Sequence, residues 1–157
     1  MPKIEIDAAE IRRGSNYPAP FHEPCLDKMR RKLGDAAGLT QFGVSLLTLS
    51  PGAWSSQRHW HSAEDEFIWV VAGEAVLVTD EGEQILRAGD CAGFPAGRPD
   101  GHHLQNRAQQ PAVVLEVGSR RPQEDVTDYV DIDMIASLKS GRRRRDGTPY
   151  PPQERRG

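Results

Sequence analysis

From residue 41 to residue 118 the chain is a succession of short apolar runs separated by turns, and this pattern constrains the fold more than any other feature. Gly82 marks the turn in residues 79–84, and a loop rich in Pro and Gly follows at 95–101. Many short strands at regular spacing are typical of an antiparallel sandwich or barrel rather than of βαβ units. We predict an all-β fold with strands at residues 41–50, 54–61, 66–73, 74–80, 83–88, 91–96, 102–107 and 112–118.

The flanking segments lack this regular alternation. Residues 25–38 have the composition of a helical turn or two, and residues 125–134 are predicted to be one extended piece. A chain of 157 residues suits one domain with a substantial core. We therefore expect an N-terminal extension (1–40) packing on the barrel, a barrel (41–120), and a C-terminal extended segment with a basic tail (121–157).

The charge is unevenly distributed along the chain. The net charge is −3, yet residues 140–157 contain six Arg against Asp146 and Glu154, with four Arg in a row at 142–145. Such a run occurs in segments that bind nucleic acid or anionic membranes. No aromatic residues interleave with it and the rest of the chain is acidic, so we predict no nucleic-acid partner and no membrane partner. We expect the tail to pack on the barrel or on a partner subunit.

The two cysteines and the N-terminus bear on the compartment. Cys25 and Cys91 are too few for a disulfide framework, and the N-terminus has no apolar core of a signal peptide. We predict reduced thiols and a cytoplasmic location. Cys91 lies in the run GDCAGF and is expected to be a small buried residue.

A group of histidines and a carboxylate marks the candidate site. His59 and His61 are two residues apart, so on a strand they point to the same side. Glu66 follows after a short polar turn, and His102 and His103 form the other histidine pair. Imidazole and carboxylate ligands suit a first-row divalent metal. We predict one divalent metal ion, which could be zinc, iron, manganese or nickel.

The spacing of these residues resembles the two sequence signatures of the cupin superfamily. The first comprises Gly52, His59, His61, Glu66 and Gly73, and the second comprises Gly89, Pro95, Gly97, His102 and Asn106. Two gaps depart from the usual pattern. Six residues instead of five separate Gly52 from His59, and four instead of two separate Gly97 from His102. Phrases such as YPAPF, SSQRHWHSAEDEF and DGTPYPP further resemble small bacterial single-domain cupins of the RmlC-like type, some of them labelled as candidate sugar-phosphate isomerases.

The resemblance implies a double-stranded β-helix, or jelly roll, that forms a cupin barrel with extended N- and C-terminal segments. It also implies a metal in the barrel mouth, held by His59, His61, Glu66 and His102. Strand parity supports His102 over His103, because His102 shares a face with Leu104 and Asn106. Glu64 and Asp65 are rivals of Glu66, but only Glu66 leaves six residues before Gly73.

Three other positions have a predicted role. Ser55 and Gln57 are in phase with His59 and His61 on the predicted strand, so they are candidates to orient the metal ligands or to contact substrate. Trp69 has the opposite parity to Glu66 and is expected at a subunit interface or against a second sheet.

Three functional interpretations compete. The first is a metal-binding single-domain cupin that acts on a small oxygen-rich metabolite, either as a sugar-phosphate-isomerase-like or as a dioxygenase-like enzyme. The second is a non-catalytic module that binds or senses a small molecule, and the third is a structural scaffold. An isomerase also needs a general base, which the sequence does not reveal. Edge strands and extended termini favour a homodimer.

Overall fold

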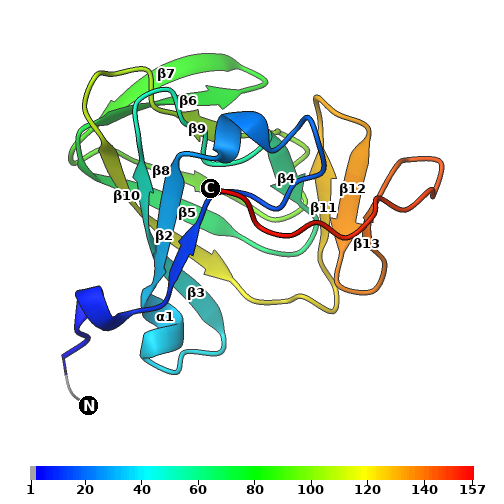
Figure 1. Cartoon of the computed structure of the whole chain (residues 1–157), viewed down its shortest axis with the longest axis horizontal. Helices are drawn as coiled ribbons and strands as arrows, with labels where there is room; N and C mark the ends of the chain where they lie inside the picture. The colour runs from blue at the N-terminus through cyan, green and yellow to red at the C-terminus, as the bar shows by residue number, and fades with distance from the viewer. Residues whose placement is uncertain (1–2) are drawn as a thin grey trace.

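The largest layer of the molecule is an antiparallel six-stranded sheet. The computed structural model describes residues 3–157 and confirms the all-β jelly roll (Figure 1). In spatial order this sheet comprises β1 (Ile11–Arg13), β2 (Lys28–Lys32), β3 (Phe42–Leu49), β10 (Ala112–Ser119), β5 (Glu66–Ala72) and β8 (Cys91–Phe94).

Two smaller sheets complete the barrel and its flank. One comprises β7 (Gly82–Arg87), β6 (Glu74–Thr79) and β9 (His103–Gln105). The other comprises β13 (Gly141–Arg143), β12 (Met134–Ser137), β11 (Val126–Tyr129) and β4 (His59–His61). The helical turns are short: η1 (Ile6–Ala8), η2 (Glu23–Cys25) and α1 (Leu33–Ala36). Within residues 3–157, no helix is long and apolar enough to cross a membrane.

The core lies between the six-stranded sheet and the sheet of β6, β7 and β9. Because side chains alternate along a strand, one face of the large sheet points inward throughout. Leu47, Leu49, Val70, Ala112 and Val114 on this inner face are fully buried. Further along the same face the residues become polar or small, since Ser45 pairs with Glu116 and Gly43 pairs with Gly118. The inner face is thus apolar at one end and can border a polar cavity at the other.

The helical prediction for residues 25–38 is largely wrong. Lys28–Lys32 form β2, which pairs with β3, and only Leu33–Ala36 make a helical turn. Lys, Met and Arg have good intrinsic helix propensity, but pairing with a long neighbouring strand outweighs it. As a result the side chains of Lys28, Arg30 and Lys32 alternate onto the inner face of the main sheet.

The predicted strand at 54–61 is shorter than expected. Only His59–His61 are strand, and residues 55–58 are bends. The Ser55 hydroxyl accepts a hydrogen bond from the Leu104 backbone N–H at 2.9 Å, a contact that replaces regular ladder pairing. The predicted extended piece 125–134 is also broken, because a turn separates β11 from β12. Cys91 is exposed on the edge strand β8, contrary to our expectation, whereas Cys25 is buried.

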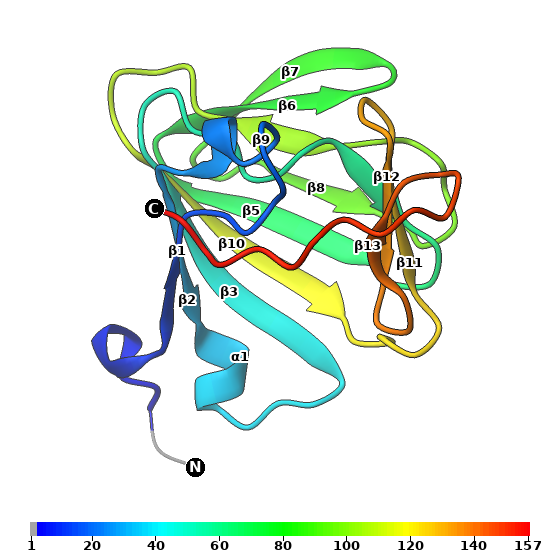
Figure 2. The same cartoon turned by 45° about the vertical axis from the view of Figure 1, so that its right-hand side comes forward.

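The basic tail folds back along its own chain. The last residues, drawn in red, end near the tip of β1 and run beside the blue segment that follows β1 in Figures 1 and 2. Ser15 and Arg156 exchange two backbone hydrogen bonds of 2.7 Å. The Arg142 guanidinium donates to Asn16 and lies 5.2 Å from the centre of the Tyr17 ring, and Arg145 pairs with Asp128. The C-terminal segment is therefore held against residues 15–17, which follow β1 at one rim of the main sheet.

Candidate metal centre

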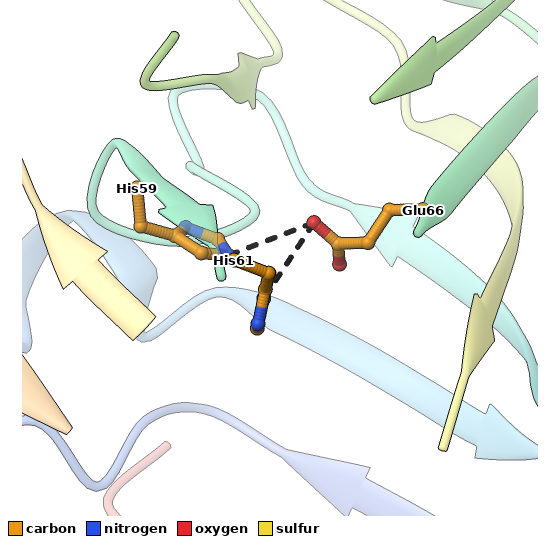
Figure 3. A group of neighbouring side chains, drawn as sticks. All are labelled: His59, His61 and Glu66. Carbon is orange, nitrogen blue, oxygen red and sulfur yellow. Dashed lines mark ion pairs between the residues drawn. The ribbon is translucent and has the colours of Figure 1, made fainter. Parts of the chain in front are cut away.

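Three imidazole nitrogens surround one carboxylate oxygen. The Nε2 atoms of His102, His61 and His59 lie 2.8, 3.7 and 3.9 Å from Glu66 Oε2. His59 and His61 project from β4 and Glu66 begins β5, whereas His102 precedes β9 at a bridge to His59. Figure 3 shows the two β4 histidines facing the Glu66 carboxylate. The structure therefore brings together all four residues that the sequence predicted as metal ligands.

Contacts behind the rings fix the tautomers of the two β4 histidines. His59 Nδ1 lies 2.8 Å from the backbone oxygen of Gln57, and His61 Nδ1 lies 2.7 Å from Asp125 Oδ2. Both partners only accept hydrogen bonds, so each Nδ1 carries the hydrogen and donates it. Each Nε2 therefore presents a lone pair toward the Glu66 oxygen. Lone pairs that face a carboxylate repel it unless a cation lies between them, so the donor set fits a metal ion.

The charge states of His59 and Glu66 also fit a metal ion. Burial lowers the pKa of His59 to about 4, although the Glu66 charge opposes the shift. Burial alone would raise the pKa of Glu66, but the His102 hydrogen bond and the neighbouring imidazoles outweigh it and lower the pKa to about 2. At neutral pH the cluster therefore contains a neutral His59 ring and an ionised carboxylate, which are the forms that bind metals.

A cavity of about 360 Å³ opens from this cluster across the inner face of the main sheet. Its size lies within the range of small-molecule sites. Gly118 pairs with both Glu66 and Gly43, so two residues without side chains lie next to the cluster. Neither has a positive φ, and a Cβ on Gly118 would lie 3.8 Å from Glu66 Cγ. These glycines therefore provide space in the cavity and not a special backbone conformation.

The rest of the cavity lining is strongly cationic. Two carboxylates line it, Glu66 and Glu116, against five cationic side chains: Arg12, Arg30, Lys32, Arg120 and Arg155. Glu116 accepts two hydrogen bonds from Arg30, at 2.6 and 2.8 Å.

Aromatic packing orients one candidate metal ligand, since the Phe94 ring stacks on His102 with 3.6 Å between centroids.

Three further side chains near the histidine cluster point in different directions: Ser55, Gln57 and His103. Ser55 lines the cavity, and its role toward ligands or substrate stays a prediction. The Gln57 side chain instead donates to the Phe21 backbone oxygen at 2.7 Å, and only its backbone carbonyl orients His59. Its predicted phase with the histidines was wrong because residues 55–58 are not strand. His103 points away from the cluster: its Nδ1 lies 2.9 Å from the Ser56 backbone oxygen.

Sequence reasoning missed two contributors to the site. Asp125 fixes His61 from a segment 64 residues away and is buried. No motif marks it, because only folding of β11 against β4 brings it there. The cationic lining was also missed, since it comes from four separate segments: β1, β2, the end of β10 and the last residues of the chain.

These features define a class of protein, the single-domain jelly-roll barrel with a candidate metal centre of three histidines and one glutamate in its cavity. Residues 45–118 match the family model described as the cupin domain. A solved structure from Silicibacter pomeroyi, named as a sugar phosphate isomerase from a cupin superfamily, is 45% identical, and the alignment covers 95% of this chain and 96% of that one, with a TM-score of 0.88. The chain belongs to the cupin superfamily.

Two further solved structures are similar. One is a candidate sugar phosphate isomerase from Acidithiobacillus ferrooxidans with 27% identity, a TM-score of 0.70, and coverage of 80% of this chain and 79% of that one. The other is the polyketide cyclase RemF from Streptomyces resistomycificus, which shares the fold at 22% identity and a TM-score of 0.64, over 84% of this chain and 87% of that one. No curated protein sequence matches the chain.

Proposed function

We propose that this protein is a metal-dependent cupin enzyme that acts on a small oxygen-rich metabolite in the manner of a sugar-phosphate isomerase. One observation carries the proposal: the lone pairs of His59 and His61 converge with a carboxylate oxygen at the end of a small-molecule cavity. The name of the 45% identical relative supports the reaction class.

Four residues would hold the metal: His59, His61, Glu66 and His102. A divalent ion bound there supplies Lewis acidity toward substrate oxygens. The chain itself orients these ligands through the Gln57 carbonyl, the Asp125 carboxylate and the Phe94 ring. Gly43 and Gly118 leave room for a substrate beside them.

An isomerase must also move a proton, and Glu116 is the candidate acceptor. It is the second cavity-lining carboxylate, outside the histidine cluster, and the Arg30 guanidinium donates one hydrogen bond to each of its oxygens. His103 is less suitable, because its Nδ1 donates to Ser56 O and its Nε2 accepts from Gln105 Nε2 at 2.9 Å. Both of its nitrogens are thus engaged, whereas each Glu116 oxygen accepts one hydrogen bond from Arg30 and has a further lone pair.

Metal analysis tests the centre. Untagged wild type, His61→Ala and His103→Ala should be purified alike, reconstituted with zinc, iron, manganese or nickel, and measured by elemental analysis. We expect about one metal per chain in the wild type and in His103→Ala, and strong loss in His61→Ala with the fold retained. Wild type that stays metal-free after reconstitution, or loss in His103→Ala alone, would contradict the assignment.

Hydrogen exchange tests the reaction. Aldose and ketose phosphates incubated in D₂O with metal-loaded protein should gain deuterium at the carbon beside the carbonyl, which proton NMR detects. Metal-dependent oxygen consumption without exchange would favour the dioxygenase alternative. Saturable binding with neither exchange nor oxygen uptake would favour the binding or sensing module.

Assembly and partners stay predictions. We propose a homodimer formed through the outer face of the main sheet, where Phe67, Trp69 and Val71 are exposed at 39%, 49% and 53%. The contacts of Arg142 and Arg145 within the chain support a tail that does not bind nucleic acid. The cytoplasmic location is likewise a proposal and rests on the sequence.

A further inference from the structure

We propose that the end of the cavity away from the histidines binds the phosphate monoester of the substrate through Lys32, Arg12 and Arg155. The proposal rests on the proposed function in so far as both use one cavity. It adds the residues that select the substrate and the anion that they recognise.

Three separate segments bring these cations to the same place. Arg12 of β1 pairs in register with Arg30 of β2, and Lys32 lies two residues further along the same face of β2. Arg155 arrives from the C-terminal segment, where its guanidinium donates to the Gly14 backbone oxygen at 2.8 Å. All of these side chains line the cavity that reaches Glu66. A ligand bound beside these cations would therefore contact both β1 and the C-terminal segment.

Two of the five cations that line the cavity are not balanced by a carboxylate of the protein. Among the cavity-lining cations Arg30 pairs with Glu116, Arg120 pairs with Asp35, and Arg12 pairs with the exposed Glu10. Within residues 3–157, Lys32 and Arg155 form no ion pair. Burial lowers the pKa of both Lys32 and Arg155. Repulsion from Arg12 and Arg30 is the next largest cause and lowers both pKa values further.

Uncompensated cations in a cavity are unusual in a chain whose net charge is −3. Lys32 is half-buried, whereas Arg12 and Arg155 are exposed. Mutual repulsion among these side chains opposes folding, and a bound anion would relieve it. The unbalanced positive charge lines the cavity, which indicates an anionic ligand.

The dimensions favour a phosphate at one end and the reacting oxygens at the other. In the sheet, β3 and β10 separate β2 from β5, so Lys32 and Ile68 lie three strand spacings apart across one row. At about 4.8 Å per spacing this is roughly 14 Å between their Cα atoms. This separation is compatible with a short phosphorylated polyol that reaches from Lys32 toward Glu66.

Phosphate fits this cluster better than a carboxylate does. A phosphate monoester presents three acceptor oxygens and close to two negative charges, whereas one guanidinium can satisfy both oxygens of a carboxylate. Three cationic groups from three segments match the larger anion.

Binding to the metal-free protein tests the site. Titration calorimetry should measure inorganic phosphate, glucose 6-phosphate, glucose and gluconate against EDTA-treated wild type, Lys32→Gln, Arg155→Gln and His61→Ala. The matched control is Arg156→Gln, which removes the same charge from the neighbouring residue, outside the cavity lining. Thermal unfolding of each variant shows whether it is folded.

We expect saturable binding of phosphate and glucose 6-phosphate that weakens about tenfold or more in Lys32→Gln and in Arg155→Gln. Arg156→Gln and His61→Ala should bind as the wild type does. Binding that survives both cavity substitutions, that requires added metal, or that is tighter for gluconate than for glucose 6-phosphate would overturn the proposal. His61→Ala removes a proposed metal ligand but no residue of the proposed phosphate site. Phosphate binding by His61→Ala therefore tests the phosphate site separately from the metal centre.

Discussion

Replacing Asp125 by Asn should weaken metal binding more than replacing it by Ala. The two Asp125 oxygens serve two donors, since Oδ2 accepts from His61 Nδ1 at 2.7 Å and Oδ1 accepts from the Ala63 backbone N–H at 2.9 Å. Asn offers one oxygen and one NH₂ group in the same shape. The backbone N–H of Ala63 cannot become an acceptor, so the amide oxygen must turn toward it and the NH₂ must face His61.

That arrangement reverses the His61 tautomer. Nδ1 must then accept, and the hydrogen moves to Nε2, where it occupies the lone pair aimed at Glu66. Loss of such a carboxylate partner typically costs 10- to 100-fold in metal affinity, about 1.4 to 2.8 kcal/mol. Asp125→Ala frees the ring to choose either tautomer, so it should bind metal better than Asp125→Asn does. Asp125→Ala leaves the Ala63 N–H without a partner, so it should be the less stable protein, by about 1–3 kcal/mol.

Competition with a chromophoric zinc chelator measures the affinities, and urea unfolding of the metal-free proteins measures the stabilities. Nitrogen NMR of the labelled imidazole reports the His61 tautomer directly. The reasoning is refuted if Asp125→Asn keeps wild-type affinity, or if Asp125→Ala binds metal more weakly than Asp125→Asn does.

Three further predictions follow from buried or exposed side chains. Burial lowers the pKa of Lys28 from 10.5 to about 7. The unfolded chain therefore binds more protons between these values, and the unfolding free energy should rise by up to about 1.4 kcal/mol per pH unit from about pH 7 to pH 9. Lys28→Met should remove this rise in urea titrations, and an equal slope in both proteins would exclude Lys28 as its source. Glu116→Gln should keep the wild-type metal content and lower the deuterium-exchange rate at least 100-fold, whereas unchanged exchange would eliminate Glu116 as the base. Trp69→Glu on the outer sheet face should convert a dimer to a monomer of 17.4 kDa in light scattering, and a dimer that persists would place the interface elsewhere.

Local pattern and spacing were sufficient for most barrel strands and for the four side chains that converge at the candidate metal centre. Residues 66–118 alternate with period 2 and are punctuated by Gly and Pro, so strand positions follow from side chains that must be buried on one face. His59 and His61 share a strand face by the same rule, and that parity also separated His102 from His103. These features depend on neighbours within a few residues, which a sequence displays.

The errors arose where tertiary pairing outweighed local preference. Lys28–Lys32 has the composition of a helix but lies beside β3, so it is a strand that turns three cationic side chains inward. Residues 55–58 did not continue β4, because the Ser55 hydroxyl and the Ser55 backbone N–H both bond to the Leu104 backbone. The Gln57 side chain was misplaced for the same reason.

The sequence by itself determined the all-β class, the family resemblance and the positions of the four candidate metal ligands, since each depends on periodicity or on fixed spacing. Only the tertiary structure decided what surrounds the metal centre. Asp125 reaches His61 across 64 residues, and Arg155 and Arg12 meet across the two ends of the chain. Such contacts depend on which strands pair and in which register, and no local pattern encodes the distance between residues so far apart in sequence.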